Sequence, residues 1–93
     1  MDNKLVILYT MKGCPHCHEL KKMLEEENIA FVDRDIDENS EEYDVFVKAT
    51  QNDFVPALLI IKEGGPKMES YLYAPDRDYE ELTEAVEIVK KHL

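Results

Sequence analysis

The chain of 93 residues has little of several residue types, and each shortage excludes a class of protein. It contains only two cysteines, which are too few for a small secreted scaffold held by several disulfides. No apolar run approaches the ~18 residues that a membrane-spanning helix requires. Basic residues are outnumbered, 11 against 21 acidic ones, and the formal net charge is -10. A nucleic-acid backbone or an anionic membrane surface is therefore an unfavourable partner.

The residues that are present indicate a folded domain. Hydrophobic residues make up 44% of the chain and lie in short periodic segments, so we expect one globular domain over residues 1–93. The first residues lead directly into an apolar strand without a secretory segment, which predicts a cytoplasmic protein. In a reducing compartment a lone cysteine pair is more often catalytic or metal-binding than structural.

Both cysteines lie in the motif Cys14-Pro15-His16-Cys17, between the apolar run Leu5–Tyr9 and an amphipathic run that begins at Pro15. If the second run is a helix, Cys14 lies at its N-terminus, where free N–H groups and the helix dipole stabilise a thiolate. Pro15 costs no hydrogen bond at the first helical position. Cys17 follows one turn later, near enough to form a disulfide with Cys14. The motif therefore predicts a redox pair in which Cys14 is the nucleophile.

The hydrophobic pattern predicts an α/β protein. Runs of β-formers predict four strands, of which the first is apolar on both faces and central, and the fourth is a half-exposed edge strand. Helical spacing predicts three helices, the second opening with a capping box of Asn39 and Glu42. The order of strand, helix and strand predicts a parallel crossover, and residues 62–67 predict a hairpin turn. The expected strands are 5–9, 29–32, 57–61 and 68–73, and the expected helices are 15–27, about 39–52, and from 76 or 78 to 93.

This succession of elements around Cys14-Pro15-His16-Cys17, with Val55-Pro56 before the third strand, resembles a glutaredoxin over nearly the whole chain. The resemblance implies a thioredoxin fold: a four-stranded mixed sheet in the order 2-1-3-4, with strand 3 antiparallel, flanked by three helices. It also implies that Pro56 is preceded by a cis peptide bond and faces the cysteine motif. Val55 would then offer its backbone N–H and C=O to a bound thiol peptide.

Two features of the sequence bear on which proteins of this fold it resembles. Glutaredoxins commonly carry tyrosine where this chain has His16, and the histidine resembles the motif of strongly oxidising bacterial disulfide-forming proteins. A histidine there can stabilise the Cys14 thiolate, which favours the reduced form and predicts a more oxidising couple. Thioredoxins proper are a poorer match, because they carry an additional strand and helix at the start and usually a tryptophan before the first cysteine. This chain has no tryptophan.

The resemblance also suggests where glutathione would bind. Glutaredoxins hold its γ-glutamyl end with Gly-Gly followed by Asp at the start of the last helix, whereas this chain reads Ala74-Pro75-Asp76-Arg77-Asp78. Gly64-Gly65 comes earlier and is expected to form the hairpin turn. The expected contacts are the last helix N-terminus, with Arg77 and Asp78 as partners for the carboxylate and ammonium groups. Lys12 could pair with the other carboxylate and help to ionise Cys14, and Tyr9 could line the groove.

The implied function is a glutathione-dependent thiol–disulfide oxidoreductase that reduces protein disulfides and glutathione mixed disulfides through Cys14 and Cys17. Glutathione would be a co-substrate, and no tightly bound cofactor or metal is expected. The expected partners are disulfide-containing proteins, with ribonucleotide reductase as one candidate, and the protein is expected to act as a monomer. One alternative is a thioredoxin-like electron donor reduced by a flavoprotein reductase. Others are an iron–sulfur cluster carrier, which Pro15 disfavours in the family, and a catalytically silent binding module.

Two further interpretations of the cysteines are weaker. The spacing Cys14-Pro15-His16-Cys17-His18 also suits covalent haem attachment, but export signals are absent and the segment fits a sheet-based fold. A structural zinc site would lack a second pair of ligands. His18 is expected to be an ordinary exposed residue on the outer face of the helix.

Overall fold

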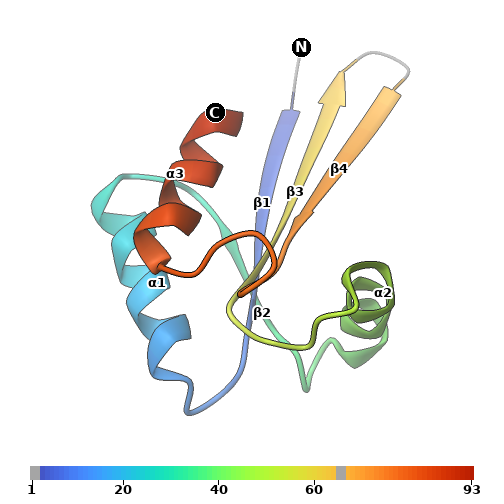
Figure 1. The fold of residues 1–93 in the computed structure, drawn as a ribbon. Coiled ribbons are helices and arrows are strands. Elements are labelled where there is room, and N and C mark those ends of the chain that lie inside the picture. Colours follow the sequence, from blue (N-terminus) through green and yellow to red (C-terminus); the bar gives the residue numbers. More distant parts are fainter. Residues whose placement is uncertain (1–2, 65–66) are drawn as a thin grey trace.

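The computed structural model describes residues 3–64 and 67–93, and in this part of the chain a four-stranded sheet carries three helices (Figure 1). The sheet order is β2-β1-β3-β4. Strand β1 runs parallel to β2 and antiparallel to β3, and β3 runs antiparallel to β4. This topology confirms the predicted fold. The strands are β1 (Asn3–Thr10), β2 (Val32–Asp35), β3 (Ala57–Gly64) and β4 (Lys67–Tyr73), and the helices are α1 (Pro15–Glu26), α2 (Ser40–Thr50) and α3 (Leu82–His92).

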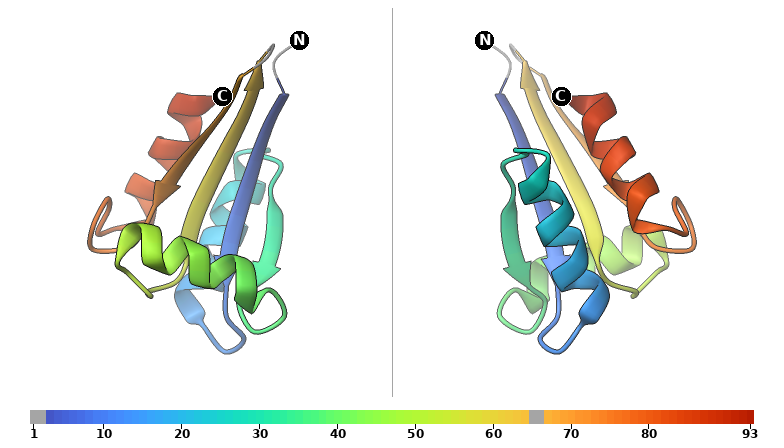
Figure 2. Two further views of the ribbon diagram at one scale, coloured as in Figure 1. Left: turned by 90° about the vertical axis from the view of Figure 1, so that its right-hand side faces the viewer. Right: turned by 90° about the vertical axis from the view of Figure 1, so that its left-hand side faces the viewer.

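Helices α1 and α3 cover one face of the sheet and α2 covers the other (Figures 1 and 2). Alternate residues of β1 divide between the two cores. Val6 and Leu8 belong to the core under α1 and α3, and Ile7 and Tyr9 belong to the core under α2. All four side chains are at most 4% exposed, which explains why the segment Val6–Tyr9 of β1 is apolar without interruption.

Helix α1 begins at Pro15, as predicted, and places one apolar stripe against the sheet. Its buried residues are Cys17, Leu20 and Leu24, each at most 1% exposed. They recur at helical spacing, so burial of this stripe fixes the rotation of the helix about its axis. The second cysteine is therefore held in the core, while the first lies at the exposed end of the helix.

The second strand begins later than predicted. The apolar residue Ile29 is 7% exposed, and its N–H donates to the carbonyl of Leu24 at 3.0 Å, so it extends the end of α1 rather than the sheet. Strand β2 pairs with β1 from Val32 to Asp35. Charged residues are tolerated there because β2 is an edge strand, and Asp33 accepts hydrogen bonds from Thr10 at 2.5 Å and Lys21 at 2.9 Å.

The predicted capping box at the start of α2 is wrong. Asn39 is the N-cap residue, but its side chain donates to the carbonyl of Asp35 at 2.9 Å and does not cap the helix. The carboxylate of Glu42 has other partners: it accepts from the Tyr9 hydroxyl at 2.9 Å and from Arg34 at 2.8 Å. Glu42 therefore binds β1 and β2 rather than closing a capping box with Asn39.

The last helix also begins later than predicted, at Leu82 rather than at Asp76 or Asp78. Asp76 has a φ of 66°, a left-handed conformation that a helix does not continue through, and the Asp78 carboxylate accepts from the N–H of Ala74 at 2.9 Å. Residues 75–81 thus form a loop. A capping box between Glu81 and Glu84 opens the helix instead.

The hairpin between β3 and β4 has the predicted antiparallel register, with Gly64 paired to Lys67. The predicted turn at Gly64-Gly65 falls partly on residues 65 and 66, which lie outside the described residues. As expected for an edge strand, β4 is only partly buried: Met68 is 68% exposed, whereas Leu72 packs against the core under α2. Among the described residues, no helix has both the length and the apolar character needed to cross a membrane.

Candidate active site

The turn from β1 into α1 presents the first cysteine. Cys14 is the N-cap residue of α1, with an extended backbone, and Pro15 takes the first helical position. Gly13 has a φ of 77°, so the chain reverses through a conformation that other residues adopt at a cost. The N–H of Cys14 closes the turn on the carbonyl of Met11 at 3.3 Å. The role of Gly13 was missed from the sequence, although a glycine just before a helix N-cap is a usable signal.

The two cysteines form a disulfide, as their spacing predicted, with a Cα–Cα distance of 5.3 Å. The N–H of Cys17 donates to the sulfur of Cys14 at 3.1 Å. Cys14 is half-buried, whereas Cys17 is 1% exposed. A substrate sulfur can therefore reach Cys14, and the helix N-terminus offers a donor to negative charge on that sulfur. Cys17 is far less accessible than Cys14, and its sulfur is bonded to that of Cys14.

The segment before β3 lies beside this turn. Tyr9, near the end of β1, pairs with Ala57 at the start of β3, so the two residues before Ala57 lie next to the strand end from which the motif departs. The bond between Val55 and Pro56 is cis, as the resemblance implied. Pro56 is buried and Val55 is half-buried.

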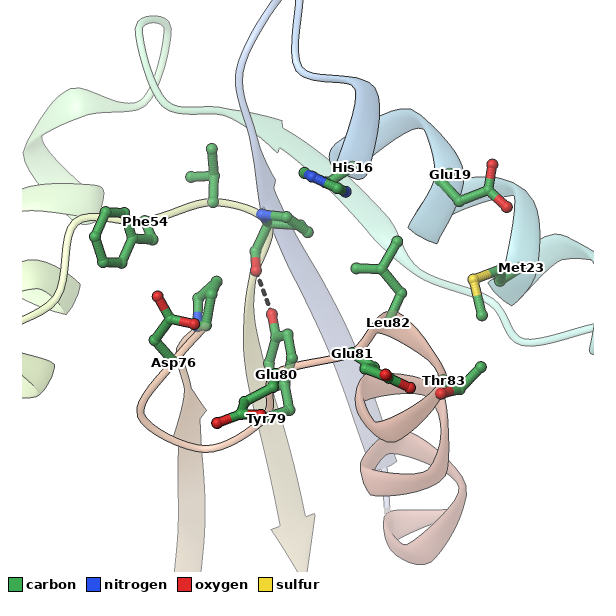
Figure 3. A pocket seen from close by; sticks show the side chains of 13 residues that line it. His16, Glu19, Met23, Phe54, Asp76, Tyr79, Glu80, Glu81, Leu82 and Thr83 are labelled. Carbon is green, nitrogen blue, oxygen red and sulfur yellow. Dashed lines mark hydrogen bonds between the residues drawn. The ribbon is translucent and has the colours of Figure 1, made fainter.

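Tyr79 supports this segment from the loop before α3. Its hydroxyl donates to the carbonyl of Pro56, and the side chain is 4% exposed (Figure 3). Burial raises the pKa of Tyr79 far above its usual range, and the nearby Asp78 carboxylate adds to this effect, so the hydroxyl remains a donor. The sequence pattern placed Tyr79 on the stripe of the last helix and missed this role. Its spacing matched the stripe, and no local signal marks a tyrosine that reaches another loop.

We expect Tyr79→Phe to destabilise the fold by about 1–3 kcal/mol, because a buried carbonyl loses its donor. The loop that carries Pro56 should also become less well positioned, so KM for a peptide disulfide should rise more than kcat falls. Urea unfolding and steady-state kinetics measure the two effects. Tyr71→Phe is the matched control: its hydroxyl bonds the exposed Glu69, so its removal should reduce stability much less than Tyr79→Phe does. Equal effects of both substitutions would contradict a positioning role for Tyr79.

A groove of about 670 Å³ opens beside the cysteine motif, which contributes His16, between α1, the Pro56 segment and the start of α3 (Figure 3). We call it the acidic groove. Part of its apolar lining is exposed to solvent, because the Phe54 side chain is 54% exposed. Met23 of α1 and Leu82 of α3 both line the groove and pack against the core under these two helices. The side chains that characterise the groove are the apolar Met23, Phe54, Val55, Pro56 and Leu82, the acidic Glu19, Asp76, Glu80 and Glu81, and His16 from the cysteine motif.

A second hollow, of about 440 Å³, lies on another side of the motif and is lined by Lys12, Lys21, Cys14 and Cys17 among others. We call it the lysine hollow. The Lys12 side chain is 80% exposed and lies 4.0 Å from the Glu38 carboxylate, a weak surface pairing. The structure thus places Lys12 beside Cys14, as expected.

The remaining residues proposed for glutathione lie differently. Tyr9 does not line the groove, because it is 1% exposed and its ring packs against Tyr43 and Phe46 under α2. Its apolar neighbours in β1 explain this burial. Arg77 and Asp78 pair with each other at 3.2 Å in the loop before α3. The prediction that the last helix begins at these residues is wrong, because α3 begins at Leu82.

Sequence comparison identifies relatives of the chain. A glutaredoxin family model matches residues 6–63. Glutaredoxin 3 of Escherichia coli strain K12 is 31% identical over 55 residues, which are 59% of this chain and 66% of that protein, slightly less than two thirds of its length. Glutaredoxin 3 from two other E. coli strains matches equally well.

Similar solved structures support the fold. The thioredoxin-like protein BC3987 has a TM-score of 0.60 at 17% identity, with 95% of this chain and 99% of that chain covered. Trichomonas vaginalis thioredoxin has a TM-score of 0.62 at 15% identity, with 97% and 79% covered. At such low identity these likenesses bear on the fold alone. Because the family model spans the strand, motif, helix and Pro56 segment that build the site, we conclude that the chain belongs to the glutaredoxin family.

Proposed function

We propose that the protein is a thiol–disulfide oxidoreductase that reduces protein disulfides and glutathione mixed disulfides with electrons from glutathione. One observation carries this proposal: a half-buried Cys14 at the N-terminus of α1 is joined to a Cys17 that is 1% exposed. This arrangement separates an attacking sulfur from a resolving sulfur. Membership of the glutaredoxin family supports the same activity.

In the first step, the Cys14 thiolate of the reduced enzyme attacks one sulfur of the substrate disulfide. A bond forms between the two sulfurs, the substrate disulfide breaks, and the other substrate sulfur leaves as a thiolate that takes a proton from water. The donor N–H of Cys17, 3.1 Å from the Cys14 sulfur in the disulfide form, is placed to stabilise the attacking thiolate. The Pro56 segment lies where the bound substrate strand would pass.

In the second step, Cys17 loses its proton and its sulfur attacks Cys14. The mixed disulfide breaks, the substrate leaves as a thiol after taking up a proton, and the enzyme retains the disulfide between Cys14 and Cys17. Two electrons have passed from the enzyme to the substrate. Two glutathione molecules then reduce the enzyme disulfide and leave as oxidised glutathione. For a glutathione mixed disulfide, a second glutathione can replace Cys17 in resolving the intermediate.

Within this proposal, Lys12 binds a carboxylate of glutathione from the lysine hollow. We expect Lys12→Gln to raise KM for a glutathione mixed disulfide about threefold, because this ratio corresponds to the free energy of one exposed charge pair. Lys22→Gln is the matched control, because Lys22 is also exposed on α1 but does not line the hollow. If both variants shifted KM equally, the effect would reflect net charge and the role of Lys12 would be rejected. Arg77 and Asp78 remain proposed contacts for the other end of glutathione.

The decisive experiment couples the protein either to glutathione with glutathione reductase or to thioredoxin reductase, and follows NADPH oxidation. The proposal expects turnover only in the glutathione system. Turnover only with thioredoxin reductase would replace the proposal with a thioredoxin-like electron donor. Inactivity in both systems, together with a brown dimer on anaerobic reconstitution, would indicate an iron–sulfur cluster carrier. Inactivity without such a cluster would indicate a binding module.

The proposal extends to the cellular setting. The protein is proposed to act as a cytoplasmic monomer, and ribonucleotide reductase is one candidate among its disulfide-containing substrates. Sedimentation of the reduced and oxidised protein measures the oligomeric state. A dimer in both states would reject the monomer.

A further inference from the structure

We propose that the acidic groove selects substrate proteins by binding a segment that carries basic and apolar side chains next to the reactive cysteine. This inference rests on the proposed function and names its protein substrates. The groove borders the cysteine motif rather than the sulfurs themselves: His16 of the motif and the Val55-Pro56 segment form part of its lining, and His16 lies two residues after Cys14. A chain joined to Cys14 by a mixed disulfide would therefore extend into it.

The apolar part of the groove provides area for binding. Phe54 is 54% exposed, and Met23 and Leu82 are half-buried. Exposed large apolar side chains next to a reactive group gain free energy when a ligand covers them. This surface suits apolar side chains of a substrate segment.

The charges of the groove determine which segment fits. Glu19 comes from α1, Asp76 from the loop before α3, and Glu80 from the same loop close to the helix. All three side chains are exposed, and within residues 3–64 and 67–93 none of them pairs with a lysine or arginine. Glu81 adds a fourth carboxylate, which also caps α3. Among the described lining residues there is no lysine or arginine, so the charge of the groove favours a cationic ligand.

The two hollows around the motif therefore differ in charge. The lysine hollow carries Lys12 and Lys21, of which Lys21 is paired with Asp33, whereas the acidic groove carries four carboxylates. The carboxylates of the acidic groove favour a basic segment of a protein substrate over an acidic one.

The test uses two peptides that differ only in charge. Each holds one cysteine, linked as a mixed disulfide to thionitrobenzoate, and is flanked by leucine with either two lysines or two glutamates. The Cys14 thiolate of the reduced enzyme attacks the peptide sulfur and releases one coloured thionitrobenzoate, after which Cys17 releases the peptide thiol. Stopped-flow absorbance gives the rate constant for each peptide. We expect the wild type to prefer the basic peptide about tenfold at low salt, and this preference to shrink in ~0.5 M salt.

Matched variants locate the preference. In the double variant Glu19→Gln/Glu80→Gln, the ratio of the two rate constants should fall to about twofold. The control Asp44→Asn/Glu63→Gln removes two exposed charges away from the groove, on α2 and on the far part of β3, and should keep the tenfold ratio. Circular dichroism confirms that both variants are folded.

Three results would overturn the inference: equal rate constants for both peptides in the wild type, a ratio unchanged in the groove variant, or an equal loss of ratio in both variants. The last result would assign the preference to net charge. Each is distinguishable from failure of the proposed function, because the wild type is assayed separately with a glutathione mixed disulfide and glutathione reductase. Should the groove variant unfold, the salt dependence of the wild-type ratio decides the same question: a ratio of one at low salt rejects the inference.

Discussion

Cys14→Ser is expected to abolish every thiol–disulfide activity of the protein, whereas Cys17→Ser should leave the reduction of glutathione mixed disulfides largely intact and impair the reduction of protein disulfides. The difference follows from position. Cys14 is half-buried at the N-terminus of α1, where the N–H of Cys17 reaches its sulfur. Serine at this place is not ionised near neutral pH and cannot replace the thiolate.

Cys17 is 1% exposed and has only Cys14 within reach of its sulfur in the described structure. Cys17 is needed when no thiol from solution can reach the mixed disulfide between Cys14 and the substrate. Glutathione is small enough to attack the intermediate from solution, so reduction of a glutathione mixed disulfide can proceed without Cys17. A folded protein substrate gives no such access and should remain attached to Cys14.

Steady-state assays with a glutathionylated small disulfide and with a protein disulfide measure the two activities. Cys17→Ala accompanies Cys17→Ser, because a serine hydroxyl buried at this position could cost about 1–3 kcal/mol of stability. In the wild type, iodoacetamide at mildly acidic pH should modify reduced Cys14 faster than free cysteine. Equal and complete loss of both activities in all three variants, or alkylation of Cys14 no faster than that of free cysteine, would contradict the assigned roles.

The sequence predicted the parts of the fold in which local pattern and burial agree. The residues Val6–Tyr9 of β1 are all apolar because two cores cover them, and α1 repeats Cys17, Leu20 and Leu24 because one stripe faces the sheet. The place of the cysteines at the junction of these two elements then followed, together with their pairing. The cis bond before Pro56 came from the family resemblance rather than from any local pattern.

The errors fall where tertiary contacts override local signals. Asn39 and Glu42 have capping-box spacing, but Glu42 bonds Tyr9 and Arg34 instead. Tyr79 has helical spacing to Val86, but the loop before α3 turns it toward Pro56. Neither contact has a sequence signal, because each joins elements far apart in the chain. The acidic groove belongs to the same class, since its carboxylates come from α1 and from the loop that the pattern assigned to a helix.

The second large effect concerns the redox potential. His16 is the second residue of α1, two positions after Cys14, and its side chain is exposed and lines the acidic groove. Imidazole is a side chain that can carry a positive charge near neutral pH, and such a charge stabilises a neighbouring thiolate. Only the reduced enzyme contains that thiolate. We therefore expect His16 to stabilise the dithiol form relative to the disulfide and to make the couple more oxidising.

We expect His16→Tyr to lower the potential by about 30 mV, which corresponds to about 1.4 kcal/mol and a tenfold change in the equilibrium constant with glutathione. Equilibration of the wild type and the variant in glutathione buffers, followed by acid quenching and alkylation, measures the change. His18→Tyr is the matched control: it makes the same substitution at another exposed histidine, two residues further along α1, and should change the potential less. A potential of the His16 variant equal to or above that of the wild type would refute the role of His16. In that case the stabilisation of the Cys14 thiolate would come from the backbone of α1 and from Lys12.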